Sequence, residues 1–382
     1  MKISFNRQEI SNKIAPLMSV VSGKSTLSAV EGILIEANSA DSCTLTVFDL
    51  EKGMRITVDA EVLEQGSYII NAQKFNQTLK VMDGEDIVLT VDAKLNAMFE
   101  CGKSSHRMGA LKAEEFPEIP DLVTEKGFVI NSSSLKKMLS KVSYAMGVNE
   151  PRPVLNGCFI KTEQGKVNVV ACDGFKLAVC SENTKLEKLE GSSKGADYSF
   201  IVPVKSVNEI VKLLSDDEDD EVTVYMSHKN MVVVFEDIVF FTRLITGEYV
   251  DYNRIIIRNH KIQVSAAKQD IIAALEKASL ITEERIAGSV RSHVRVEVCE
   301  DILKVSAVSF AGSIYDEFNV EHTGDDISIA FNNRFLIDSI RACRSEKIKI
   351  SMSSPLMSIN VEPCDDEDGE ELFMLLPVRT RD

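Results

Sequence analysis

The 382-residue chain lacks the patterns that membrane proteins and most enzymes need. No apolar run approaches the roughly 18–20 residues required to span a bilayer. The N-terminal stretch MKISFNRQEI is amphipathic and has no signal-peptide core, so we expect a cytoplasmic protein without a membrane partner. The five histidines lie far apart, none in H-x-x-x-H spacing, and no constellation of catalytic residues is visible.

The eight cysteines form no C-x-x-C pair. A zinc site needs close pairs of ligands, and a disulfide framework is typical of short secreted chains. Neither condition holds, so the cysteines are best interpreted as reduced, small apolar residues. We therefore expect no metal, no cofactor and no enzymatic activity.

One stretch, VVSGKSTL (Val20–Leu27), suggests a phosphate-binding loop. The P-loop pattern needs a first glycine five positions before Gly23, where this chain has Met18. The flanks also differ, because residues 6–21 have helical periodicity and GILIEA after the loop is typical of a strand. Pro16 should kink or shorten that helix. A nucleotide-dependent phosphotransferase using Gly23–Thr26 remains the alternative from the enzyme class.

What the chain does contain is a threefold repeat. YIINAQKFNQTLKVM, FIVPVKSVNEIVKLL and ISIAFNNRFLIDSIRAC each combine a short strand, a polar cap and an amphipathic helix. Aligned on Phe75, Val207 and Phe335, they are 132 and 128 residues apart, close to a third of the chain. Each copy also has an opening strand and helix, a middle strand such as CTLTVFDLEKGMRITV, and a later strand pair. The pattern predicts three α+β domains, at 1–125, 126–253 and 254–382, called repeats 1 to 3 below.

The net charge of −16 is unevenly distributed. The six predicted helices (6–21, 72–82, 132–146, 204–214, 267–281 and 332–344) carry 14 basic and 5 acidic residues. The acidic runs Asp216–Glu221 and Asp365–Glu371 lie outside them. This segregation indicates one surface that accepts a polyanion while the rest repels it. No base-reading motif is present, so we expect contacts to the nucleic-acid backbone without sequence preference.

These features resemble the bacterial DNA polymerase III beta subunits, the sliding clamps. The resemblance covers the whole chain and is strongest at Val154–Ser181, at FIVPVKSVNEIVKLL, at Arg243–Ile256 and at FMLLPVR (Phe373–Arg379). It implies three clamp domains per chain and a head-to-tail homodimer that closes into a ring, with helices lining the hole. It also implies a processivity factor of DNA replication that encircles duplex DNA. The implied protein partners are the replicative polymerase, the clamp loader and other proteins with a clamp-binding motif.

The resemblance and the helical charge together suggest which residues contact DNA. The SGKST loop then faces DNA phosphate instead of nucleotide phosphate. The predicted DNA-binding residues are Lys24, Lys74, Lys136, Lys137, Lys141, Arg152, Lys205 and Arg334. For closure of the ring, the resemblance implies an edge strand at Ser105–Ala110, with His106 and Met108, facing Leu280 and Ile281 of the other chain.

The partner-peptide pocket is expected at the junction of repeats 2 and 3. Its predicted residues are Cys172, Gly174, Phe175, Lys176, Leu177, Val250, Ile255, Met374, Leu376, Pro377, Val378 and Arg379. Phe175 and Val250 stand where the family has histidine and proline, which should make the pocket more apolar. A monomeric peptide-binding scaffold that never closes on DNA is the second alternative.

Overall fold

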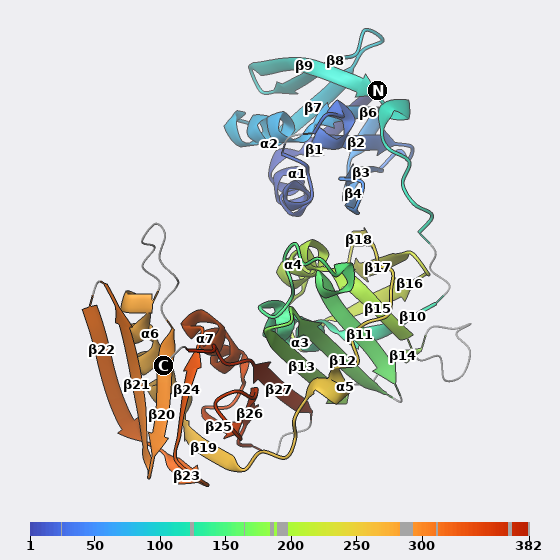
Figure 1. Cartoon of the computed structure of the whole chain (residues 1–382). Coiled ribbons are helices and arrows are strands. Elements are labelled where there is room, and N and C mark those ends of the chain that lie inside the picture. Colours follow the sequence, from blue (N-terminus) through green and yellow to red (C-terminus); the bar gives the residue numbers. More distant parts are fainter. Residues whose placement is uncertain are drawn as a thin grey trace. The chain divides into compact units, whose positions relative to one another are not determined.

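A computed structural model of the chain describes residues 1–23, 25–122, 126–163, 165–183, 187–188, 198–282, 293–310, 312–365 and 369–380 (Figure 1). These residues form two compact units. The first contains the described residues of Met1–Ser134 and Asn208–Leu244, with the short strand β14 (Glu187–Lys188). The second contains those of Leu135–Lys185, Gly195–Val207 and Ile245–Asp382.

The six predicted helices are all present. They are α1 (Arg7–Ile14), α2 (Ala72–Val81), α3 (Ser132–Ser143), α4 (Val204–Leu213), α6 (Lys268–Thr282) and α7 (Asn333–Ala342), and a short α5 (Tyr252–Ile255) joins repeats 2 and 3. The first is shorter than the predicted 6–21, because Pro16 has no N–H and opens a separate 3-10 turn, η1 (Pro16–Ser19). None of the helices in the described ranges is both long and apolar enough to cross a bilayer.

Asparagine begins four of these helices at equivalent places in the repeats. The side chains of Asn6, Asn71, Asn131 and Asn332 each accept hydrogen bonds from backbone N–H groups of the first helical turn. Each asparagine directly follows a strand or ends it. The N-cap satisfies donors that the helix itself leaves unpaired. This strand–Asn–helix step explains why the helix starts could be read from the sequence.

Among the described residues of the first unit, fourteen strands form one antiparallel sheet. Their order is β14, β10 (Gly127–Asn131), β16 (Glu221–Met226), β17 (Asn230–Phe235), β18 (Ile238–Arg243), β4 (Lys52–Asp59), β3 (Ser42–Phe48), β2 (Gly32–Ala37), β6 (Gly66–Asn71), β9 (Ser104–Lys112), β8 (Asn96–Cys101), β7 (Asp86–Val91), β1 (Lys2–Asn6) and β5 (Glu61–Glu64). The pairing of β18 with β4 joins repeat 2 to repeat 1 in this sheet.

The described residues of the second unit form two sheets. The larger has the order β15 (Tyr198–Pro203), β11 (Gly157–Glu163), β12 (Lys166–Cys172), β13 (Lys176–Asn183), β27 (Glu370–Leu375), β26 (Ile359–Pro363), β25 (Lys347–Met352), β19 (Ile262–Ala267) and β23 (Glu321–Thr323). The smaller has the order β22 (Gly312–Asn319), β21 (Ile302–Ser309), β20 (Val294–Cys299) and β24 (Ile327–Phe331). The pairing of β13 with β27 joins repeat 2 to repeat 3, so repeat 2 contributes strands to both units.

Each segment predicted as one middle strand is in fact a hairpin: β3–β4, β12–β13 and β21–β22. In the first, Asp49 Oδ1 accepts from the N–H groups of Glu51 and Lys52 at 3.0 and 2.7 Å. In the second, Asp173 Oδ1 accepts from Phe175 and Lys176, both at 2.9 Å. The same aspartate turn in two copies supports a duplicated domain at the level of single hydrogen bonds.

Candidate functional site

The strand β27 places the end of the chain beside the middle of repeat 2. Leu177 lies opposite Met374 in the β13–β27 ladder, and the N–H of Leu376 donates to the carbonyl oxygen of Phe175 at 2.9 Å. Side chains alternate between the two faces of a strand, so Leu177 and Met374 share one face. Cys172, opposite Leu177 in the β12–β13 ladder, shares it too. Three residues predicted for one pocket are therefore neighbours.

These residues belong to a buried apolar cluster that includes strands of both repeats. Its buried members are Leu155, Val170, Cys172, Leu177, Val179, Ile201, Tyr249, Ile256, Leu372 and Met374, and Val154, Phe159, Ile245, Val250 and Tyr252 pack against them. Burial raises the pKa of the Cys172 thiol and of the Tyr249 hydroxyl, which keeps both neutral at physiological pH.

Several predicted residues surround this cluster and remain exposed. Phe175 is 60% exposed and follows Gly174, whose φ of 91° is the left-handed conformation that glycine adopts readily. The Asp173 turn thus presents Phe175 to solvent. Ile255, Leu376, Val378 and Arg379 are also exposed, and Val250 and Pro377 are half-buried. We call Val154, Phe175, Val250, Leu376 and the cluster beneath them the apolar patch.

Lys176 was predicted in the pocket but faces the opposite side of β13. Its ammonium group pairs with Asp173 and lies 4.3 Å from the centre of the Phe335 ring. Conversely, Leu155, Val154 and Tyr249 belong to the cluster and were not predicted. Leu155 and Val154 lie in the stretch Val154–Ser181, whose resemblance to the clamp family could have indicated that they belong to the pocket.

The predicted DNA contacts lie mostly on helices. Lys74 on α2, Lys137 on α3, Lys205 on α4 and Arg334 on α7 are exposed, and Lys136 is half-buried. Each of these four helices thus carries at least one basic side chain at its surface, as the charge count indicated. Lys24 lies outside the described residues. The segments that flank it are η1, then η2 (Ser28–Glu31) and β2, so the strand–loop–helix order of a P-loop is absent there.

Two of the predicted DNA contacts have other neighbours. Lys141 Nζ lies 2.5 Å from Glu371 Oε1, and its side chain is only 19% exposed. Its charge is therefore already balanced within the protein. Arg152 is exposed, but a side chain at Gly174 would meet its guanidinium Nη2 at 3.8 Å. Arg152 thus lies at the apolar patch, where a guanidinium can bind a carboxylate.

Among the open strand edges of the described residues are those of β9 and β22. β9 pairs with β6 only at Ala110–Lys112. Among the described strands, its Ser104–Gly109 part therefore has a neighbour on one side only, which is β8. Among the described strands, β22 pairs with β21 alone. On β9, Met108 is buried and exposed His106 makes a 2.8 Å hydrogen bond with Thr78 Oγ1.

Beside β22, at the end of α6, Leu280 is 76% exposed and Ile281 is half-buried. The ion pair between Lys277 and Asp316, at 2.6 Å, fixes α6 against β22. An exposed leucine next to an unpaired strand is a combination that favours association with another chain. Within the described residues, no group of three or more histidine, cysteine or acidic side chains could hold a metal ion.

Comparison with known protein families gives three matches in succession along the chain. Models described as the N-terminal, central and C-terminal domains of the DNA polymerase III beta subunit match residues 1–120, 129–251 and 253–377.

Individual proteins match over the whole chain. A "Beta sliding clamp" of Chlamydia muridarum is 28% identical over 384 residues, covering 100% of both chains. Among solved structures, a putative DNA polymerase III beta subunit from Eubacterium rectale has a TM-score of 0.92 at 22% identity, again covering 100% of both chains. A sliding clamp from Pseudomonas aeruginosa, solved bound to griselimycin, has a TM-score of 0.88 at 23% identity and the same coverage. At these identities the structural matches establish the fold.

Proposed function

The chain belongs to the DNA polymerase III beta subunit family, and we propose that it acts as the sliding clamp of DNA replication. It encircles duplex DNA without sequence preference and holds the replicative polymerase on its template. The observation that carries this function is the unbroken succession of the family's three domains along one chain. The helices on each repeat supply the basic surface that a ring around a polyanion requires.

The ring is a head-to-tail homodimer, and its closure is proposed at the open edges of β9 and β22. The edge of β9 in one chain would pair with β22 of the other, giving two equivalent contacts. Leu280 and Ile281 would add apolar burial. The exposed Glu317 on β22 would face Lys103 and Arg107 near β9, so the charges of the two edges are complementary.

The DNA contacts are proposed at Lys74, Lys136, Lys137, Lys205 and Arg334, and at Lys24, which lies outside the described residues. A ring retained by topology needs only contacts that salt can screen, because tight binding would prevent sliding. We do not include Lys141, whose ammonium group is held by Glu371. Such a clamp acts by tethering, so we propose no enzymatic activity and a cytoplasmic location with the chromosome.

Polymerase, clamp loader and other partners are proposed to bind at the apolar patch. A peptide with leucine and phenylalanine side chains can bury them against Val154 and Val250, which cover the buried cluster, while Phe175 and Leu376 cover their sides. Arg152 and Arg379 offer guanidinium groups to carboxylates of the same peptide. The phenyl ring at position 175 makes this site favour a bulky aromatic anchor.

Retention on DNA tests the function directly. The protein, loaded onto a nicked circular duplex by a clamp loader, should stay on the circle through gel filtration and leave when a restriction enzyme linearises it. Equal loss from circular and linear DNA would favour the monomeric scaffold. ATP turnover by the isolated protein would favour the phosphotransferase alternative.

A further inference from the structure

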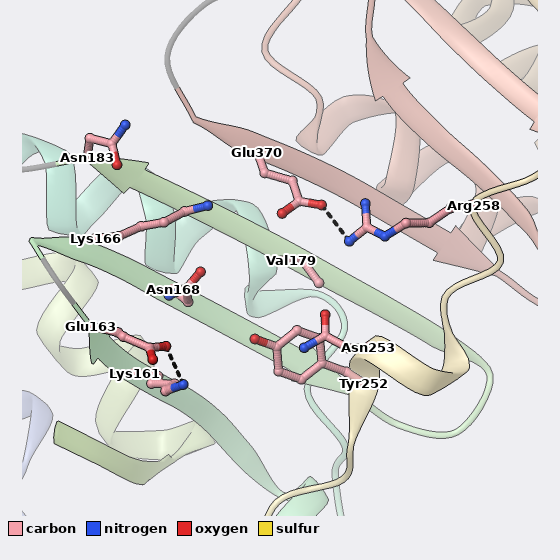
Figure 2. Close-up of a pocket in the computed structure, with 10 residues that line it drawn as sticks. All are labelled: Lys161, Glu163, Lys166, Asn168, Val179, Asn183, Tyr252, Asn253, Arg258 and Glu370. Carbon is pink, nitrogen blue, oxygen red and sulfur yellow. Dashed lines mark hydrogen bonds and ion pairs between the residues drawn. The ribbon is translucent and has the colours of Figure 1, made fainter. Parts of the chain in front are cut away.

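A polar cavity of about 440 Å³ lies in the second unit, on strands β11, β12 and β13 and beside β27 and α5 (Figure 2). The site proposed for partner peptides does not include it. In Figure 2, Tyr252 reaches from α5 toward the strands, and Lys161, Lys166 and Asn168 rise from β11 and β12. The cavity is therefore built on regular strands whose positions are fixed by their ladders.

The cavity and the apolar patch lie on the same face of one sheet. Along β13, Leu177, Val179 and Asn183 point to one side, because side chains alternate. Val179 belongs to the apolar cluster and also lines the cavity, and Tyr252 packs against the cluster and lines the cavity as well. The face is apolar at Leu177 and becomes polar toward Asn183. The helix α5, with Tyr252, lies where this face changes from apolar to polar side chains.

The opposite face of these strands is covered. Lys141 and Tyr144, on and just after α3, contact Glu371 and Phe373, which alternate with Glu370, Leu372 and Met374 along β27. The face that carries the patch and the cavity is thus the one turned away from α3. A segment bound in the patch can continue along this face to the cavity.

The charges around the cavity leave one cation unbalanced. Three basic and two acidic residues line it. Lys161 pairs with Glu163, and Arg258 Nη2 lies 2.9 Å from Glu370 Oε1. Lys166 has no ion pair or hydrogen bond from its side chain to any described residue. In a chain of net charge −16, this local excess of positive charge is distinctive.

The remaining polar groups also favour an anionic oxygen. The carboxamides of Asn168 and Asn183 line the cavity without side-chain hydrogen bonds to described residues. Asn168 stands opposite Lys161, and Asn183 stands opposite Lys166, so donors flank the unbalanced ammonium group. A carboxylate accepts several hydrogen bonds at once and matches this set of donors.

We propose that this cavity is a second subsite that binds an acidic side chain of a partner segment whose apolar anchors occupy the patch. The inference rests on the proposed function of the patch. Leu177 and Asn183 are six strand residues apart, or roughly 20 Å at about 3.3 Å per residue. An extended peptide covers that distance in roughly six residues. The subsite would therefore select partners with an acidic residue about four to six residues from the anchors.

Peptide titration tests the subsite. All fluorescent peptides carry the same glutamine–leucine–phenylalanine anchor. One series is extended before the anchor and one after it, and in each series a single Glu is placed in turn at the third to seventh residue from the anchor. Matched peptides carry Gln instead, and a short peptide carries the anchor alone. At one flanking position we expect the Glu peptide to bind about three- to tenfold tighter than the Gln peptide, and the difference to shrink with salt.

Variants of the protein locate the effect. Lys166→Met should abolish the preference for Glu, and Lys166→Glu should reverse it, while neither changes the affinity of the short peptide. Lys229→Met, an exposed lysine of the first unit, is the matched control and should leave the preference intact. Equal affinities for Glu and Gln peptides at every position, or a preference that survives Lys166→Met, would overturn the subsite. Failure of the short peptide to bind would reject the proposed function of the patch, and the subsite with it.

Discussion

Lys141 Nζ lies 2.5 Å from Glu371 Oε1, and this ion pair joins helix α3 of repeat 2 to strand β27 of repeat 3. The other oxygen of Glu371 accepts from the backbone N–H of Arg344 at 2.9 Å, and the Arg344 guanidinium lies 3.3 Å from Oε1. The Glu371 side chain is 2% exposed. A buried carboxylate of this kind is stable because its partners are fixed around it.

Removing that carboxylate should destabilise the second unit. Glu371→Ala leaves the Lys141 ammonium group without its carboxylate in a largely buried site and removes one carboxylate partner of Arg344, and we expect a loss of about 3–5 kcal/mol in the free energy of unfolding. Urea titration at fixed protein concentration measures it. Glu276→Ala is the control, because the Glu276–Arg341 pair is more than half exposed and should contribute less than about 1 kcal/mol. A Glu371→Ala loss no larger than the control value would contradict this account of the junction.

The end of the chain should be separable into a structural and a binding part. Met374 and Leu375 are buried in β27, whereas Leu376 and Val378 are more than a third exposed. Deleting residues 376–382 should leave the strand in place and weaken the binding of an anchor peptide about tenfold or more, because the peptide then buries less apolar surface. Phe175→Ala should act in the same direction.

Fluorescence polarisation measures the peptide affinity of the 376–382 deletion and of Phe175→Ala. The control is Leu63→Ala, which truncates an exposed leucine on β5. Deletion from Met374 onward should instead reduce stability, because it removes two buried side chains from the ladder with β13. Unchanged peptide affinity in the 376–382 deletion would place the partner site elsewhere.

Neutralising the helical cations should change the salt dependence of DNA binding. A variant with Lys74, Lys137, Lys205 and Arg334 replaced by Ala should lower the slope of log K against log salt by about one unit for each DNA phosphate that the variant no longer binds. The reduction should be equal for DNA of any sequence. The control replaces four exposed lysines outside the helices, Lys94, Lys126, Lys229 and Lys261. If both variants flatten the slope equally, the helices are not the DNA surface.

Closure of the ring should depend on the end of α6. Leu280→Asp with Ile281→Asp introduces charge where we propose apolar burial between chains, so we expect a folded monomer in analytical ultracentrifugation. Circular dichroism checks that the fold persists. Leu356→Asp, at another exposed leucine, should remain dimeric. A dimer that survives the double substitution would reject this interface.

The thiols should divide into two classes of reactivity. Cys299 and Cys364 are exposed and the other six cysteines are buried. Burial raises the pKa of Cys43 and Cys180 to about 12 and that of Cys343 to about 11. Ellman's reagent should therefore titrate two thiols in the folded chain and eight in denaturant, since the thiolate is the reactive form.

Within the exposed pair, a hydrogen bond with Asp326 raises the pKa of Cys299. The thiolate of Cys299 should therefore form at a higher pH than that of an ordinary thiol, and the labelling rate of Cys299 should increase over that higher pH range. Mass spectrometry of the labelled peptides identifies the site, and rapid modification of more than two cysteines in the native protein would show that the core opens.

The sequence was sufficient for the helices because each has a buried apolar stripe and most have a capping asparagine. It was insufficient for the first hairpin, where Leu50 has a φ of 79° in a turn that lacks glycine or proline. The Asp49 side chain stabilises that turn through two hydrogen bonds, a local effect without a strong sequence signature. One long strand was therefore predicted where two occur.

The candidate site could be predicted only as a set of segments. The resemblance indicated CDGFKL and MLLPVR, but which side chains share a face depends on the β13–β27 register. That register places Leu177 with Met374 and turns Lys176 toward Phe335. Likewise, helical periodicity places Lys141 on a helix face but does not reveal that Glu371, 230 positions later, approaches it.

The order of synthesis gives the β13–β27 ladder a further consequence. The ribosome adds the partner strand of β13 roughly 200 residues after β13 itself, which at roughly 5–20 residues per second takes about 10–40 s. During that time the edge of β13 has no strand beside it, and the patch lacks Met374 and Leu376. On the proposed function of the patch, a nascent chain lacks part of its polymerase site until β27 and the residues after it have been synthesised, and only a fully translated chain carries the complete patch.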